Sequence, residues 1–251
     1  MRLKLKQFTL GWLMILAALS LPAWAESREE FHKTVALQAD GSFSLKNING
    51  NVTVLGWDRK EAQIDAVKTA SSEKKLHEAN IEVNGSGYSV NVETRYPSHT
   101  NNDPARVEYT IHLPRSARVA GVETVNGEVK IDGISGRIHA STVNGKMEVW
   151  NASGELELDA VNGEIKASLL GAGHSAVKLN TVNGNLILGM VGEVNARIKA
   201  TTVNGKIQSE LPVSIDKPKY GPGMSVDSTL GADGALIELE AVNGNIYLRK
   251  L

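Results

Sequence analysis

The 251-residue chain contains no cysteine, three phenylalanines and seven prolines, and aromatic residues make up only 5% of it. The absence of cysteine excludes disulfides, a thiolate nucleophile, cysteine metal ligands and a lipid anchor on cysteine. A core with so few aromatic side chains must be built from Val, Ile, Leu and Ala in thin layers, which favours a solenoid over a thick globule. The net charge of −1 gives no indication of a nucleic-acid or anionic-surface partner.

Long apolar runs are also scarce, and the one that exists lies at the N-terminus, between Phe8 and Leu21. Three basic residues precede it, and the small-residue sequence "AWA" follows at positions 23–25. This pattern is typical of a secretory signal peptide cleaved before Glu26, while the run is short for a retained membrane anchor. We therefore expect an exported protein, periplasmic or extracellular, with a signal peptide at residues 1–25 and no membrane span after its cleavage.

The most abundant feature is the tripeptide Val-Asn-Gly, which starts at positions 125, 143, 161, 182, 203 and 242, with a looser copy, "ING", at Ile48. The successive starts differ by 18, 18, 21, 21 and 39 residues, so the recurrence is a period with insertions. We expect each copy to form a structural corner, because Asn and Gly both tolerate the left-handed backbone of sharp turns. The predicted corner residues are Asn49, Gly50, Asn126, Gly127, Asn144, Gly145, Asn162, Gly163, Asn183, Gly184, Asn204, Gly205, Asn243 and Gly244.

Apolar residues follow these glycines at positions 2, 4 and 7, as in Met147, Val149 and Ala152 after Gly145. Positions 2 and 4 give the period of a strand with one buried face, and position 7 is expected to turn inward again. The valine of each Val-Asn-Gly would then fill the core, and the stacked asparagines could hydrogen-bond in a column. The sequence predicts an all-β fold, a single-stranded parallel β-helix (β-solenoid) with coils of about 18–21 residues.

An antiparallel meander of hairpins is the alternative, because Asn-Gly is also a strong hairpin signal. In two-residue hairpins, however, Val125 would pair with Glu128, Val143 with Lys146 and Val161 with Glu164 on one face. Three such valines would lie on the charged side, which makes the solenoid the favoured interpretation.

The repeat pattern divides the chain into three parts. Residues 1–25 form the signal peptide, residues 26–118 a degenerate coil with a β-rich cap segment, and residues 119–251 the repeat solenoid with an insertion at about 211–234. The last coil ends with the chain, so we expect it to be covered either by this insertion or by a second molecule, which would make a homodimer through the C-terminal coil.

Charged residues at outward positions mostly alternate in sign between neighbouring coils, which is typical of a solvated scaffold. The best catalytic candidates are Glu155, Glu157 and Asp159 with His139 one coil below, but charge alternation explains these residues without catalysis. The six histidines show no metal-ligand spacing, and the threonine column beside the corners is interrupted by alanine. We expect no enzymatic activity, catalytic residue, cofactor or metal.

The motifs "NGNVTVLGWDR", "TVNGEVKI", "TVNGKMEV" and "AVNGEIKA" resemble the bacterial "putative adhesin" family of β-strand-repeat proteins, a domain of unknown function related to head-domain auto-transporter adhesins. The resemblance covers about residues 40–251 and implies an exported β-helix without demonstrated chemistry. It favours a non-enzymatic binding or structural module of the cell envelope, whose partner would be an envelope protein or glycan. The alternative from a different class is a carbohydrate-active β-helix enzyme.

Overall fold

The computed structural model describes residues 26–97, 104–171, 175–219, 221–232 and 234–251. The expected signal peptide lies outside the described residues. The described chain forms nineteen strands and one short helix, α1 (Glu73–Glu78), so the predicted all-β class is confirmed. None of the helical segments within the described ranges has the length and apolar character needed to cross a bilayer.

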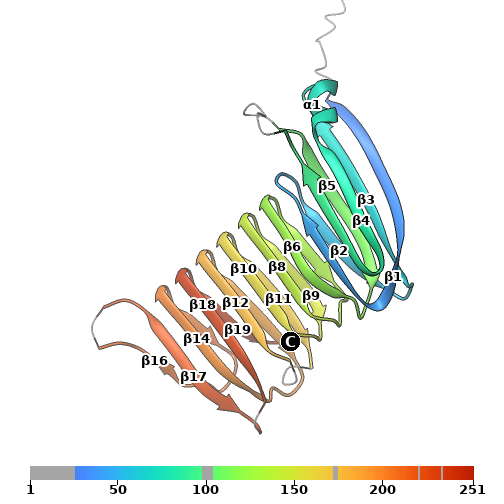
Figure 1. The fold of residues 1–251 in the computed structure, drawn as a ribbon. Coiled ribbons are helices and arrows are strands. Elements are labelled where there is room, and N and C mark those ends of the chain that lie inside the picture. Colours follow the sequence, from blue (N-terminus) through green and yellow to red (C-terminus); the bar gives the residue numbers. More distant parts are fainter. Residues whose placement is uncertain (1–25, 98–103, 172–174, 220, 233) are drawn as a thin grey trace, which may run out of the picture.

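The strands form two facing layers that follow one long axis (Figure 1). In spatial order, sheet A contains the first half of β1 (Ser27–Lys46), β3 (Glu61–Ala70), β5 (Arg106–Pro114), β2 (Val52–Trp57), β7 (Val129–Asp132), β9 (Met147–Ala152), β11 (Ile165–Leu170), β13 (Leu186–Val191), β19 (Ile246–Lys250) and β15 (Ile207–Ser209). Sheet B contains β4 (Asn80–Arg95), the second half of β1, β6 (Arg118–Asn126), β8 (Ile138–Asn144), β10 (Leu156–Asn162), β12 (Val177–Asn183), β18 (Ala235–Asn243), β14 (Ala196–Asn204), β17 (Met224–Leu230) and β16 (Ile215–Asp216).

Each coil consists of one strand from sheet B, a corner, and one strand from sheet A, as in β8 with β9 or β10 with β11. Equivalent strands of neighbouring coils pair in parallel and in register, so that Leu156 of β10 lies between Ile138 and Val177. Apolar side chains from both layers meet between them, and Ile138, Met147 and Leu156 are fully buried there. The aliphatic thin-layer core expected from composition is therefore present.

Antiparallel strands occur at both ends of the stack, so the expectation of a single parallel β-helix is wrong as stated. At one end β3 pairs antiparallel with β1 and β5, and at the other β17 pairs antiparallel with β14 and β16. These strands come from the segments that interrupt the repeat. They cover edge strands whose backbone donors and acceptors would otherwise be unpaired.

The order of the coils differs from their order in the sequence. The coil made by β18 and β19 lies between the coil of β12 and β13 and the coil of β14 and β15, as the red strand between orange ones in Figure 1 shows. We call β18 and β19 the inserted coil. The expectation that this last coil ends the stack and needs a cover is wrong, because β18 and β19 are each paired along both edges. The 211–234 insertion instead covers β14.

The buried pattern in sheet B also differs from the expected one. The six valines of Val-Asn-Gly are 38–51% exposed, whereas the preceding threonine or alanine is buried, as in Thr142 and Ala160. In strands β8 and β10, buried and outward-facing side chains alternate strictly up to position 6 after the preceding glycine. In sheet A the expected position 7 is buried at Ile134 and at Ala152, where Asn151 adopts a φ of 55° and adds a residue to the turn inward. After Gly163 the prediction is wrong, because Leu170 is exposed and Leu169 is buried in its place. The hairpin alternative anticipated exposed valines, but the strands there are parallel.

Candidate functional site

The corner glycines are required by the close stacking of the coils. A Cβ on Gly145 would lie 2.0 Å from the carbonyl oxygen of Gly127, and one on Gly163 would lie 1.8 Å from that of Gly145. Of the corner glycines, only Gly50 has a positive φ. The sequence-based reason for glycine, a left-handed backbone, is therefore wrong for the other corners, where the missing side chain is what matters.

The corner asparagines form a continuous ladder of side-chain hydrogen bonds along the stack. Each Nδ2 donates to the Oδ1 of a neighbouring coil at 2.8–3.0 Å. Asn243 lies between Asn183 and Asn204 in this ladder, so its order follows the spatial order of the coils. The amides thereby fix the register of every corner to the next one.

The buried threonines and exposed valines make the edge beside the ladder. Thr142, Thr181 and Thr202 donate their hydroxyls to the carbonyl oxygens of Gly127, Gly163 and Gly244. These threonines are buried, so their hydroxyls do not form an exposed array on the surface. The exposed residues form what we call the valine ridge, which consists, in spatial order, of Ile48, Val125, Val143, Val161, Val182, Val242 and Val203.

Charges alternate more regularly on the outer face of sheet B than the sequence order suggests. In register, His139 lies beside Glu157, Glu157 beside Lys178, and Glu238 between Lys178 and Lys199. In sequence order, Lys178 and Lys199 would be neighbours. The inserted coil separates these two cations with a carboxylate, which favours the observed order over the sequential one.

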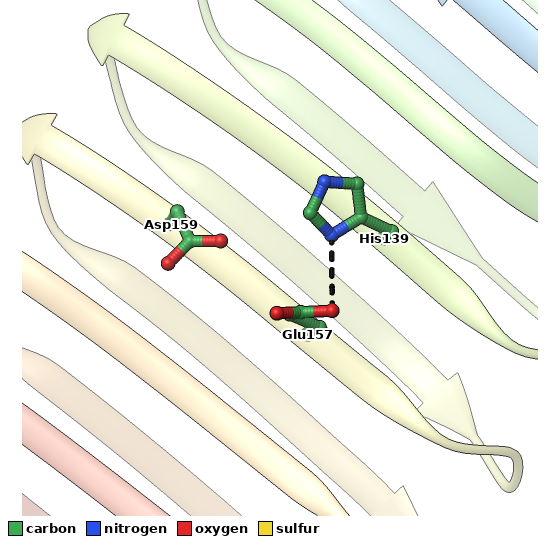
Figure 2. Close-up of side chains that lie close together, drawn as sticks. All are labelled: His139, Glu157 and Asp159. Atoms are coloured by element: carbon green, nitrogen blue, oxygen red, sulfur yellow. Dashed lines mark ion pairs between the residues drawn. The ribbon is translucent and has the colours of Figure 1, made fainter.

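Three of these side chains come together where β8 and β10 pair (Figure 2). His139, Glu157 and Asp159 bring one imidazole nitrogen and two carboxylate oxygens within 4.8 Å of one another. The His139 Nδ1 atom lies 3.4 Å from Glu157 Oε2, and Asp159 accepts a hydrogen bond of 2.8 Å from Asn180. Period-two spacing on β10 puts both carboxylates on one face, and register supplies the histidine from β8.

Glu155, the remaining catalytic candidate, is not part of this cluster. Its carboxylate accepts hydrogen bonds from Arg137, including one of 2.8 Å from Nε. The hydrogen bond and the charge of Glu155 raise the pKa of Arg137 above its usual value. Glu155 is thus committed to an ion pair between neighbouring coils, in line with its expected role in charge alternation.

The chemistry available to the cluster follows from its ligand types and exposure. An imidazole nitrogen and two carboxylates can coordinate a divalent transition-metal ion. The coil register already placed these three residues together in the sequence as catalytic candidates. The spacing between histidines gave no metal-ligand signal, because two of the three possible ligands are carboxylates from the coil 18 residues later. The side chain of Glu157 is half-exposed on an open sheet face, which lacks the desolvation that tunes most catalytic acids and bases.

Two larger hollows mark the same face of sheet B. One, of about 530 Å³, is lined by Arg118, Arg137, His139, Glu155 and Glu157 among others. The other, of about 470 Å³, lies against the valine ridge, where Val182, Val242 and Val203 face the polar side chains of Asp159, Asn180 and Glu240. The second hollow combines an apolar wall with a polar, acidic one.

No family model and no curated protein matches the chain. A solved structure described as a "putative cell adhesion protein" from Clostridium sporogenes is similar in fold, with a TM-score of 0.52 and 15% identity over 90% of this chain and all of that one. A "putative adhesin" from Parabacteroides merdae aligns with a TM-score of 0.36 and 8% identity, over 89% of this chain and 96% of its own. At 15% identity the first likeness supports the fold alone.

Proposed function

We propose that this chain is an exported, non-enzymatic binding module of the cell envelope, built on a β-solenoid and adhesin-like in role. It acts in the periplasm or outside the cell, and its partner is an envelope protein or glycan. The contact face is the outer face of sheet B, and the observation that carries this assignment is the hollow beside the valine ridge. The description of the Clostridium sporogenes structure, which is similar in fold, agrees with such a role.

The hollow is suited to binding because it combines exposed aliphatic side chains with polar and acidic ones. Three adjacent valines, Val182, Val242 and Val203, are each more than 40% exposed. Together they form an apolar strip whose exposure to water is unfavourable and which a partner can cover. Asp159 and Glu240, which also line the hollow, add directional acceptors. Such a combination fits recognition better than catalysis, for which the described residues provide no desolvated acid–base pair.

The test is binding of the mature chain to a bacterial envelope fraction. We expect saturable binding that the double variant Val182→Lys with Val242→Lys abolishes. Val143→Lys is the matched control, because Val143 occupies an equivalent corner with similar exposure but does not line the hollow. Equal loss in both variants, or no loss in either, would reject this face as the contact site.

The class of partner is separated by treating half of the fraction with protease and half with periodate. Loss of binding after protease indicates an envelope protein, and loss after periodate a glycan. The carbohydrate-active enzyme alternative predicts release of soluble sugar from the fraction, which Glu157→Gln would stop without changing the unfolding midpoint. Sugar release of this kind would contradict the non-enzymatic role.

A further inference from the structure

The inserted coil is held in a slot whose two walls belong to earlier parts of the chain. Strand β18 pairs with β12 on one side and β14 on the other, while β19 pairs with β13 and β15. The backbone of Gly184 donates to Asn243 and that of Gly244 to Asn204, each at 3.1 Å. Both walls therefore present parallel strand edges to the inserted coil.

The connection that leads into this coil is tightly packed and depends on glycine. Strand β17 lies on the far side of β14 from β18, so the chain must cross the start of β14 to reach the slot. A Cβ on Gly231 would lie 1.8 Å from Asn195 Oδ1, and one on Gly234 would lie 1.8 Å from the carbonyl oxygen of Asn195. The inserted coil is joined to β17 through this crossing. The path of the crossing therefore decides whether the coil enters the slot of its own chain or that of another copy.

The slot is also selective for the coil that fills it. Glu238 lies between Lys178 and Lys199, and Asn243 bridges Asn183 and Asn204. A Cβ at Gly244 would lie 1.7 Å from the carbonyl oxygen of Gly184, so the incoming corner must carry glycine. A carboxylate, an asparagine and a glycine at these three register positions are supplied together by another copy of this chain.

We propose that the inserted coil is exchangeable, and that two copies of the chain associate by each placing its β18 and β19 in the slot of the other. Every ladder hydrogen bond and charge contact of the coil is kept in trans, because none of them requires its own chain. Only the connection from Leu230 to Ala235 changes, because it then joins β17 of one molecule to β18 in the slot of the other. The product is a reciprocal two-fold dimer, and this proposal does not depend on the proposed envelope-binding face.

The experiment uses single cysteine variants of the mature chain, which has no cysteine of its own. Lys178→Cys and isotope-labelled Glu238→Cys are unfolded together, refolded at high protein concentration and oxidised. Positions 178 and 238 are outward-facing register partners on adjacent strands, within the usual span of a disulfide. We expect a crosslinked heterodimer, identified by mass, and a doubling of the molar mass in light scattering.

The matched control replaces only the second partner. Lys178→Cys is refolded with labelled Glu157→Cys, whose position pairs with 178 in the same way but lies on the preceding coil rather than the inserted one. We expect no heterodimer above background in this mixture. Absence of heterodimer in the 178/238 mixture, or equal heterodimer in both mixtures, would overturn the exchange proposal.

Discussion

At the residue scale, the same tripeptide serves three purposes that the sequence pattern does not separate. The asparagine links coils by its amide, the glycine allows two backbones to approach, and the valine lies outside the core. Apolar character alone suggested burial for the valine, but the alternation of buried and outward side chains in β8 and β10 continues to the residue before it. The residue before the valine, such as Ala160, is the buried one.

The register predicts losses of stability of different size for two adjacent residues. Ala160→Asp places a carboxylate among buried side chains and should lower the free energy of unfolding by at least about 2 kcal/mol. Val161→Asp changes an exposed position and should cost less than about 1 kcal/mol. Urea unfolding of both variants measures this, and a larger loss for Val161→Asp would mean that the register is reversed.

The corner glycines give a second prediction at this scale. Gly145→Ala forces a Cβ against the backbone of the neighbouring coil and should destabilise the protein by roughly 1–3 kcal/mol. Gly121→Ala is the control, because its Cβ would have no neighbour closer than 3.5 Å. Equal thermal midpoints for the two variants would refute the requirement for close approach.

At the element scale, neighbouring strands are held in register by columns of residues that occupy equivalent positions in successive coils. The period-two apolar positions and the asparagine column could be read from the sequence, because they depend on strand geometry common to all coils. The order of the coils could not be read from the corners, since every corner is nearly identical. The sequence did hold one signal against sequential stacking. In the outward-facing column, sequence order would put Lys178 beside Lys199, which places two like charges together.

The asparagine ladder predicts a difference between its interior and its end. Asn162 donates to Asn144 and accepts from Asn183, whereas Asn204 donates to Asn243 at the last coil. Asn162→Ala should therefore cost about 1–2 kcal/mol, and Asn204→Ala about half as much, at roughly 1 kcal/mol per hydrogen bond. Chemical denaturation measures both losses, and a larger loss at the end of the ladder would contradict its continuity.

The charge column predicts a salt-dependent effect on the inserted coil. Glu238→Lys places three lysines in neighbouring register positions and should lower stability by about 1 kcal/mol at low salt. Added salt should reduce this loss, because the side chains are at the surface. Glu238→Gln removes the attraction without adding repulsion and should have a smaller effect. A loss that salt leaves unchanged would point to packing instead of charge.

At the scale of the whole molecule, both ends of the stack follow one plan. The second half of β1 with β2 lies between the β4 and β5 coil and the β6 and β7 coil, as β18 with β19 lies between two earlier coils. Antiparallel strands then cover the outer coils. The interrupting segments, which carry no repeat, could be located in the sequence, but their partners depend on contacts far apart along the chain.

The measurement that tests this architecture most directly is disulfide trapping within one chain, in the monomeric fraction. Lys178→Cys with Glu238→Cys should form an intramolecular disulfide readily, and so should Lys199→Cys with Glu238→Cys, because each pair occupies adjacent strands. Lys178→Cys with Lys199→Cys should not, because a strand separates them at ~10 Å, beyond the reach of a disulfide. Efficient closure of the 178/199 pair, with none at 178/238, would show that the coils stack in sequence order and would contradict the inserted coil.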